Sequence, residues 1–313
     1  MRSELTYTIT EKDDGKKLTA FLQEQGVSRR LLEEIKHQEG GLTVNREKAL
    51  PGDTLSAGQT LIVRLPLEKN DDWITPEEIP LRIVYEDEDL LVINKDAGIL
   101  VHPTPNHPKG TLANALAYYF AQKKEPFTFR IVNRLDQDTS GLLIIPRHAF
   151  SASVLGREVE THQIERVYLA AATGDVRDVF PKGEGVIDAP IARVPGEGML
   201  RKVDFEHGDP ARSRVRVLGY KESLDTSLCA VTLENGRTHQ IRVHFAYIGH
   251  PLPGDFLYHP DMHLIGRQAL HAYRLTFVHP LTGEELSFEA PLPEDMRLFI
   301  PEDEKGKEDL CIN

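Results

Sequence analysis

The stretch VNRLDQDTSGLLII, residues 132–145, decides how the fold of this chain is read. Its first half is polar and contains Arg134, Asp136 and Asp138, and its second half is a glycine followed by an apolar run. A short apolar run behind a turn-forming cluster predicts a buried strand. A carboxylate at the mouth of such a strand can be held rigidly and partly desolvated, as catalysis requires. The simpler alternative is an Asp-turn that leads into the strand.

The chain around this stretch alternates between strand and helix signals. Apolar, branched runs predict strands at residues 90–95, 141–146, 166–172, 213–219, 227–233 and 285–291. Helical spacing predicts helices at residues 111–122, 149–160 and 239–249. Helices scattered among strands without a regular βαβ rhythm predict an α+β domain, which we place at residues 81–300.

The N-terminal part reads as a separate small domain, residues 1–68. It has two helical patterns, the second with Ser28 as a predicted N-cap, followed by short strands at 42–45 and 60–65. Arg29, Arg30 and Lys36 project from the second helix, either as a solvated face or as a phosphate contact. The polar residues 69–80 predict a linker, and residues 301–313 form a charged tail.

Composition narrows the class of protein. The 313 residues are 40% hydrophobic and 27% charged, typical of a globular protein of two domains. The two cysteines match no metal or redox spacing, and the sequence has no apolar signal core or membrane-spanning run, so we expect a cytoplasmic protein without membrane contact. The net charge of −12 argues against a nucleic-acid partner, although a local basic face can still bind phosphate.

Two further stretches could carry chemistry. In NGRTHQIRVH, residues 235–244, Arg237, His239, Arg242 and His244 lie close together in sequence. The two histidines are five residues apart, not the four of a helical zinc motif, and Asp136 with Asp138 lacks a third ligand, so no metal site is predicted. Tyr168 lies on a predicted strand, where it is either a core aromatic or a stacking platform for a flat ligand.

The order of these motifs resembles the RluA-type pseudouridine synthases over about residues 80–293. The resemblance rests on GILVHPTPNHPKGTLANAL, VNRLDQDTSGLLII, ERVYLA, NGRTHQIRVHFAYIGHPLPGD and LHAYRLTFVHPLTGE, and the RLDxxTSG and GRTHQIRVH pair is highly specific. It implies a catalytic domain with a mixed, mainly antiparallel sheet. Residues 27–53 resemble a small RNA-binding fold shared with a ribosomal small-subunit protein, which turns Arg29, Arg30 and Lys36 into expected RNA contacts.

The resemblance also implies roles for single residues. The family isomerises uridine in RNA without a cofactor, and Asp136 matches its essential aspartate, as nucleophile or as base. Arg242 matches the arginine that pairs with it, a cation that favours the ionised carboxylate. Tyr168 matches the tyrosine that stacks on the uracil. Arg134 matches the arginine that fills the gap left when the base is flipped out of a helix.

Some expectations stay open at this point. Asn133 stands where many members have histidine, which puts in doubt any transfer of their substrate details. We expect RNA contacts from Arg237 and His239, ribosomal RNA as a more frequent target than transfer RNA, and a monomer. The alternative to an enzyme is a non-catalytic RNA-binding ribosome assembly factor that retains the fold. The intact set of Asp136, Tyr168 and Arg242 argues against that alternative, because a binder does not need a desolvated ion pair.

Overall fold

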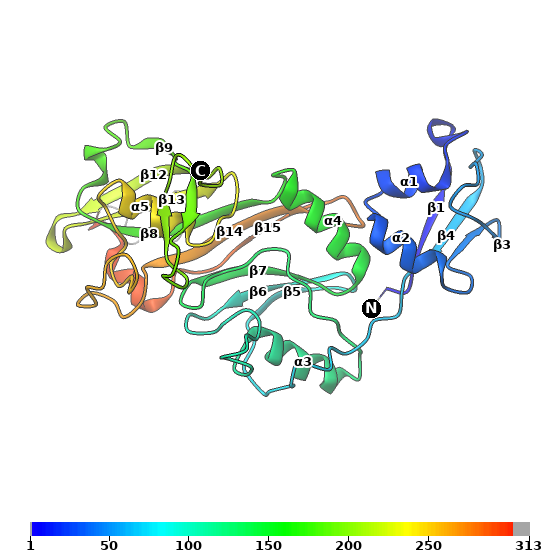
Figure 1. The fold of residues 1–313 in the computed structure, drawn as a ribbon, viewed down its shortest axis with the longest axis horizontal. Coiled ribbons are helices and arrows are strands. Elements are labelled where there is room, and N and C mark those ends of the chain that lie inside the picture. The colour runs from blue at the N-terminus through cyan, green and yellow to red at the C-terminus, as the bar shows by residue number, and fades with distance from the viewer. Residues whose placement is uncertain (1, 303–313) are drawn as a thin grey trace.

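The computed structural model describes residues 2–302 and shows an elongated molecule with a small N-terminal domain at one end (Figure 1). This domain has a sheet of its own, covered by two helices. Its elements are β1 (Glu4–Thr8), the 3-10 helix η1 (Glu11–Asp13), α1 (Leu18–Glu24), α2 (Arg29–Lys36), β2 (Leu42–Val44), β3 (Glu47–Lys48) and β4 (Thr60–Arg64). The strands pair antiparallel in the order β1-β4-β2-β3.

Helix α2 has one apolar, buried face and one charged face, as its sequence predicts. The Ser28 hydroxyl caps the helix by accepting a hydrogen bond from the Leu31 N–H at 3.2 Å. The apolar side chains Leu31, Leu32 and Ile35 are buried in the domain core. The charged side chains therefore point away from the core, on the opposite face of the same helix.

The rest of the chain is built on one large sheet. Its strands are β5 (Ile83–Glu86), β6 (Leu90–Lys95), β7 (Ser140–Pro146), β8 (Glu165–Thr173), β9 (Glu184–Asp188), β12 (Arg212–Lys221), β13 (Thr226–Leu233), β14 (Leu270–Val278) and β15 (Glu285–Glu289). Their order is β5-β6-β7-β14-β8-β13-β12-β9, with β15 paired to β14. Among the described strand pairs only β7 with β14 is parallel, so the expected α+β fold with a mainly antiparallel sheet is confirmed.

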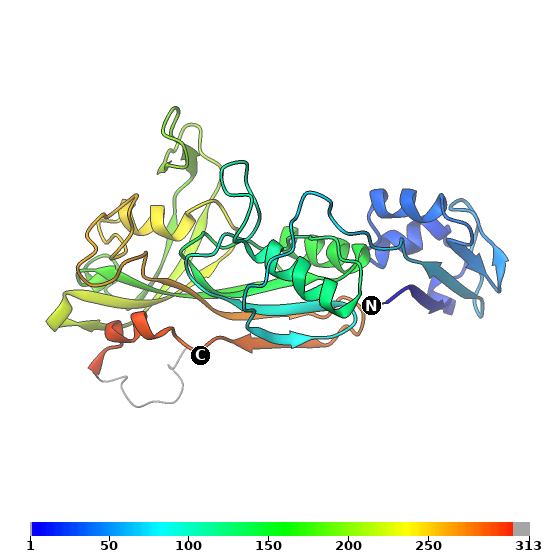
Figure 2. The same cartoon turned by 90° about the horizontal axis from the view of Figure 1, so that it is seen from below.

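A two-stranded hairpin stands apart from this sheet. It consists of β10 (Ile191–Arg193) and β11 (Arg201–Val203), which pair with each other. Figure 2 shows it projecting from the body of the molecule. We call residues 191–203 the arm. Neither of its strands was predicted from the sequence.

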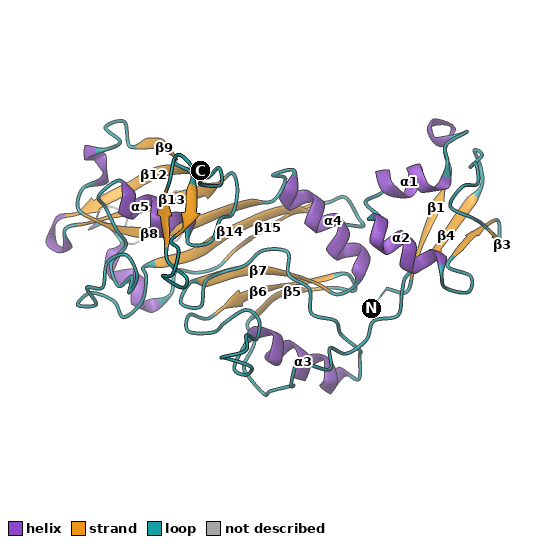
Figure 3. Cartoon of the chain, in the orientation of Figure 1, coloured by secondary structure: helices purple, strands orange, loops and turns teal. Residues whose placement is uncertain are grey.

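Helices cover both faces of the large sheet (Figure 3). On one face lie α3 (Leu112–Lys123) and α5 (Gln240–Tyr247), and on the other lie α4 (Ala149–Glu160) and the 3-10 helix η4 (Glu294–Phe299). Alternate residues of β7 join the two cores, Leu143 on the first face and Leu142 and Ile144 on the second. The apolar run of this strand is continuous because neither of its faces meets water.

Gly141 allows β7 and β14 to approach each other closely. Its φ of +113° lies in a region that side chains rarely adopt, and a Cβ there would lie 2.2 Å from the Ala272 carbonyl oxygen. Any larger residue would push the two strands apart. The glycine of the TSG sequence is therefore required by the sheet itself.

The small domain is docked against α4. Its core cluster includes Phe150 and Val154 from that helix. The Ser153 hydroxyl donates to the Gly26 carbonyl at 2.7 Å and accepts from the Ser28 N–H at 3.0 Å. Apolar packing and a paired hydroxyl together fix the angle between the domains.

The segment predicted as a linker has no helix or strand but is tied to the large domain. Glu68, the residue before the segment, is buried, accepts from the Ala149 N–H at 3.1 Å and pairs with Arg130 at 2.8 Å. Asn70 and Asp71 accept from the backbone N–H groups of Phe127 and Phe129. Polar composition suggested a loose connection, but its side chains are used for hydrogen bonds to the neighbouring loop.

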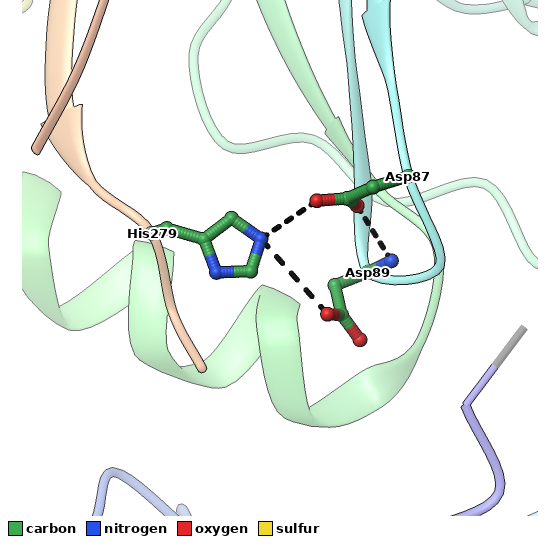
Figure 4. Close-up of side chains that lie close together, drawn as sticks. All are labelled: Asp87, Asp89 and His279. Atoms are coloured by element: carbon green, nitrogen blue, oxygen red, sulfur yellow. Dashed lines mark hydrogen bonds and ion pairs between the residues drawn. The ribbon is translucent and has the colours of Figure 1, made fainter. Parts of the chain in front are cut away.

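A cluster of Asp87, Asp89 and His279 lies where the two domains meet (Figure 4). His279 Nε2 lies 2.8 Å from Asp87, and its Nδ1 accepts from the Thr282 N–H, which makes Nε2 the protonated nitrogen. A metal on Nε2 would need the opposite tautomer. We therefore interpret the cluster as structural.

Asp89 in that cluster links the chain's beginning to α4. Arg2 donates to it at 2.8 Å, and His148, the N-cap of α4, lies 2.9 Å from it. Burial alone would raise the pKa of Asp89, but the hydrogen bonds from His148 and Arg2 outweigh burial and lower the pKa to about 2. The carboxylate thus joins β1, α4 and the sheet at neutral pH.

Two expectations concern the chain as a whole. Within residues 2–302 no helix is long and apolar enough to cross a membrane. Most of the predicted charged tail, residues 303–313, lies outside the described residues.

Candidate active site

Asp136 lies in the loop that enters β7, and each of the next four residues is held in place separately. The Gln137 carbonyl accepts from Lys95 Nζ at 2.8 Å and the Asp138 carbonyl from Arg267 at 3.1 Å. The Thr139 hydroxyl accepts from Gln268 at 3.2 Å, and the Ser140 hydroxyl lies 2.9 Å from His271 Nδ1. A loop with so many independent ties holds its carboxylate in a fixed direction.

Lys95 holds the loop from a buried position. Its ammonium is buried and donates to three backbone carbonyls, of Asp96, Ile99 and Gln137, at 2.8–2.9 Å. Burial lowers the pKa of Lys95 to about 7, opposed by the charges of Asp138 and Asp136. The three donors of a protonated lysine match the three carbonyls.

Arg242 joins Asp136 to a second carboxylate. Its Nη1 lies 2.9 Å from Asp136 Oδ2, while Nε and Nη2 form a two-pronged bond to Asp255, each at 2.7 Å. Asp255 and Arg242 are fully buried, whereas Asp136 is partly exposed. Burial alone would lower the pKa of Arg242, but Asp255 and Asp136 raise it above its usual value. The guanidinium is a permanent cation aimed at one oxygen of Asp136.

His239 lies on the same side of Asp136. Its Nε2 is 3.9 Å from Asp136 Oδ2, and its side chain is almost fully buried. The residue precedes α5 in a left-handed conformation, with φ of 59°. Burial lowers the pKa of His239, opposed by Asp136, so the imidazole is neutral at neutral pH. Among the described residues no side chain hydrogen bonds to Asp136 Oδ1, which leaves that oxygen available.

Tyr168 extends from β8 on the same face of the sheet as α5. It belongs to the core cluster that contains Leu135 and Ile241, which neighbour Asp136 and Arg242 in sequence. Burial raises the pKa of Tyr168, and the charge of Asp136 raises it further while Arg166 opposes. The phenol is therefore protonated at neutral pH, with its ring close enough to feel the carboxylate.

A cleft of about 690 Å³ lies beside this group: its lining includes Thr238, which precedes His239, and Arg201, which Tyr258 links to His239, but none of the four side chains described above. It lies between the loop before β7, the residues that precede α5, and the arm. Its lining carries five cationic side chains and two carboxylates: Arg134, Arg193, Arg201, Lys202, Arg237, Asp204 and Asp209. An excess of positive charge in a concave surface concentrates anions such as phosphate.

The structure thus gathers most of the predicted site residues but not all of them. Asp136, Arg242, His239 and Tyr168 lie together, and Arg134 and Arg237 line the adjoining cleft. Arg29, Arg30 and Lys36 lie on α2 in the small domain, far from α5 (Figure 1). Asn133 is buried and accepts from the Ile144 N–H at 3.0 Å, so it anchors the loop to β7.

Several site residues were missed in the sequence. Lys95 ends an apolar strand pattern and Asp255 ends a stretch rich in proline and glycine, and neither context gives a local sign that a charged residue will be buried. Tyr258 follows Asp255 by three positions, and nothing in its local sequence indicates its contacts with His239 and Arg201. For Asp255 the signal that could have found it is the stretch GHPLPGD, which ends at that residue and belongs to the family resemblance, whereas the quoted motifs contain neither Lys95 nor Tyr258.

Comparisons with known proteins identify the family of this chain. The profile of the RNA pseudouridylate synthase family matches residues 89–247. An uncharacterised RNA pseudouridine synthase of Bacillus subtilis, YjbO, is 40% identical over 280 residues, which cover 90% of this chain and 96% of the relative. The ribosomal large subunit pseudouridine synthase D of Neisseria meningitidis serogroup B is 38% identical over 272 residues, or 83% of this chain and 71% of that protein.

Among solved structures, human RNA pseudouridylate synthase domain containing 1 matches with a TM-score of 0.56 and 26% identity, covering 69% of this chain and 84% of the human one. The family profile covers about half of the chain, and the Bacillus relative covers nearly all of it. The chain therefore belongs to the RluA-type family of RNA pseudouridine synthases, which isomerise uridine in RNA.

Proposed function

We propose that this enzyme converts specific uridines of ribosomal RNA to pseudouridine, that Asp136 is the group that acts on the target nucleoside, and that no cofactor takes part. The observation that carries the proposal is the orientation of Asp136: Arg242 holds Oδ2 at 2.9 Å, and Oδ1 has no partner among the described side chains. An aimed, ionised carboxylate suits both a nucleophile and a base.

The reaction itself needs nothing beyond such a group. The bond from the sugar to nitrogen 1 breaks and the uracil turns. Carbon 5 then bonds to the sugar, and the proton of carbon 5 is lost while nitrogen 1 gains one. Atoms and electrons balance within the nucleoside and the solvent, so no redox partner is required. Asp136 either attacks the sugar or removes a proton from it, and both routes begin from the ionised form.

Tyr168 and Arg134 have complementary parts in this proposal. The buried ring of Tyr168 would contact the flat face of the uracil. Because burial raises the pKa of this phenol, removal of the carbon 5 proton by Tyr168 would first need another group to take the phenol proton. Arg134 is exposed at the cleft and would fill the space that a flipped uridine leaves in its helix.

The choice of RNA rests on two features. Relatives such as the Neisseria protein are named for the ribosomal large subunit. The cationic cleft and the exposed Arg29 and Arg30 of α2 offer phosphate contacts at two well-separated places, as a large folded RNA would need. Arg237 lines the cleft, and His239 lies beside Asp136. The substrate strand would pass both residues.

The test is tritium release from carbon 5 of labelled uridine. Ribosomal and transfer RNA fractions from cells that lack this gene would be assayed separately with the wild type and with Asp136→Asn. We expect release from ribosomal RNA by the wild type. Asp136→Asn should be slower by at least about 1,000-fold, the size seen when an acting side chain is removed. RNA affinity and thermal midpoint serve as controls and should stay close to wild type.

The alternative function is a non-catalytic RNA-binding assembly factor. It predicts no release from any fraction by the wild type, together with RNA binding that Asp136→Asn leaves unchanged. Release from transfer RNA alone would replace the substrate class in the proposal and keep the role of Asp136.

A further inference from the structure

Tyr258 lies at the junction of the arm, His239 and Arg242. Its hydroxyl accepts a hydrogen bond from the backbone N–H of Arg201, the first residue of β11, at 3.0 Å. The same hydroxyl lies 3.1 Å from His239 Nδ1. Its ring faces the Arg242 guanidinium at 5.3 Å, and its backbone N–H donates to Asp255. No other described side chain contacts both the arm and the groups around Asp136 in this way.

The directions of these hydrogen bonds indicate which ring nitrogen of His239 carries the proton. A backbone N–H can only donate, so the Tyr258 oxygen is the acceptor from Arg201. That leaves the phenol proton free to point to His239 Nδ1, and in this arrangement the neutral imidazole carries its own proton on Nε2. In the opposite tautomer, an Nε2 lone pair would face the Asp136 carboxylate and the phenol proton would have no acceptor among the described residues.

The backbone at His239 supports a functional reason for this placement. Its φ of 59° and ψ of 20° are left-handed, which costs about 1–2 kcal/mol for a residue with a side chain. Strain of this kind persists where the surroundings impose it, and such positions cluster at functional sites. The conformation turns the ring so that Nδ1 meets Tyr258 while Nε2 meets Asp136.

We propose that Tyr258 is a positioning residue of the reaction: its hydroxyl, anchored to the arm, holds His239 in the tautomer that presents Nε2–H to Asp136 Oδ2. At 3.9 Å this N–H is too far from Oδ2 for a hydrogen bond, so it adds an electrostatic attraction to the 2.9 Å bond by which Arg242 fixes Oδ2, and it leaves Oδ1 for the nucleoside. The catalytic consequence rests on the proposed function of Asp136, whereas the tautomer does not. Neither Tyr258 nor His239 is required to touch the substrate in this role.

The experiment compares four variants: Tyr258→Phe, His239→Gln, the double variant, and Tyr247→Phe as a control. Tyr247 loses the same hydroxyl from an exposed position at the end of α5, outside the cleft. His239→Gln supplies an amide donor near the Nε2 position that does not depend on Tyr258. Thermal midpoints of all four check that each protein is folded.

The tautomer is read from the ¹⁵N NMR signals of the imidazole, which are assigned to His239 by their loss in His239→Gln. We expect the Nε2–H form in the wild type and in Tyr247→Phe, and a mixture of tautomers in Tyr258→Phe. An Nδ1–H form in the wild type would overturn the proposal. This reading needs no turnover, so it decides the tautomer even if the wild type releases no tritium and the proposed function fails.

The rate is read from single-turnover tritium release at saturating enzyme, with RNA affinity measured in parallel. Tyr258→Phe should slow release about fivefold, the rate equivalent of one hydrogen bond, and leave the RNA affinity within about twofold. In the His239→Gln background the same change should have no further effect, because Tyr258 acts through His239. Independent, multiplicative losses, or a Tyr258→Phe rate equal to that of Tyr247→Phe, would refute the positioning role.

Discussion

Two cationic regions of this protein differ in how their charges are held. At the candidate active site the Arg242 guanidinium is buried between Asp255 and Asp136, and each of its bonds is 2.7–2.9 Å long. On α2 the cations are at the surface, where Arg30 pairs with Glu34 at 3.1 Å and Lys36 with Glu33. The buried guanidinium of Arg242 is held in one orientation, whereas the exposed side chains of α2 can change their rotamers to bind a ligand.

The difference separates positioning from affinity. A buried ion pair fixes direction, and removing one partner leaves an uncompensated charge in the interior. An exposed pair contributes little to stability and is screened by salt. Substitutions in the buried pair of Arg242 and Asp255 should therefore change stability and rate, and substitutions on α2 should change affinity and its salt dependence.

The largest effect is expected for Asp255→Asn. It removes the partner of a buried guanidinium and should lower the free energy of unfolding by about 3–5 kcal/mol. The rate of tritium release should also fall, because Arg242 would turn away from Asp136. Urea unfolding measures the first effect. Glu34→Gln, which breaks the exposed pair with Arg30, is the matched control and should change the free energy by less than about 1 kcal/mol. Equal losses in the two variants would remove the distinction.

A smaller effect is expected from pH at Lys95. Below its pKa of about 7 the ammonium donates to three carbonyls, and above it the amine has only two N–H groups for them. The hydrogen bond from Lys95 to the Gln137 carbonyl should therefore weaken as pH rises through 7. Single-turnover tritium release should slow about fivefold, which is the rate equivalent of one hydrogen bond. The charged groups that influence Lys95 are Asp138, Asp136, Arg267 and Asp96.

Lys95→Met is the control for this pH dependence. It should be slow at every pH between 6 and 9 and lack the alkaline decline of the wild type. A wild-type rate that is constant over that range would contradict the assigned titration.

The mildest effect is expected on α2. Changing Arg29, Arg30 and Lys36 together to Gln should weaken RNA binding and make its salt dependence shallower by about 0.9 for each phosphate that the variant no longer neutralises. The single-turnover rate at saturation should not change. The control changes three exposed lysines of the same domain that lie off α2, namely Lys12, Lys17 and Lys48, to Gln. An equal loss of affinity in both variants would show that net charge, and not the face of α2, attracts the RNA.

Local patterns predicted most of the secondary structure. The limits of α4 at residues 149 and 160 were predicted, and Ser28 caps α2 as expected. The strand at 90–95 coincides with β6. In each case, the deciding interactions are between residues near each other in sequence, such as a cap, an apolar face or a turn.

Long-range features were beyond such patterns. The insertion of β14 between β7 and β8 brings residues 270–278 next to a strand about 130 positions earlier, and nothing local indicates it. The same holds for Lys95 beneath the loop of Asp136 and for Tyr258 beside His239. The domain limits, a monomeric state and a cytoplasmic location stay predictions.

The glycine of the TSG sequence, Gly141, is required by the fold and not by the proposed chemistry. Its requirement comes from the spacing of two backbones, and it would persist in a relative that had exchanged Asp136 for another residue. A search of genomes with this motif therefore finds chains that share the fold, whether or not they convert uridine to pseudouridine. The residue at the position of Asp136 is what should be examined before such a chain is recorded as an enzyme.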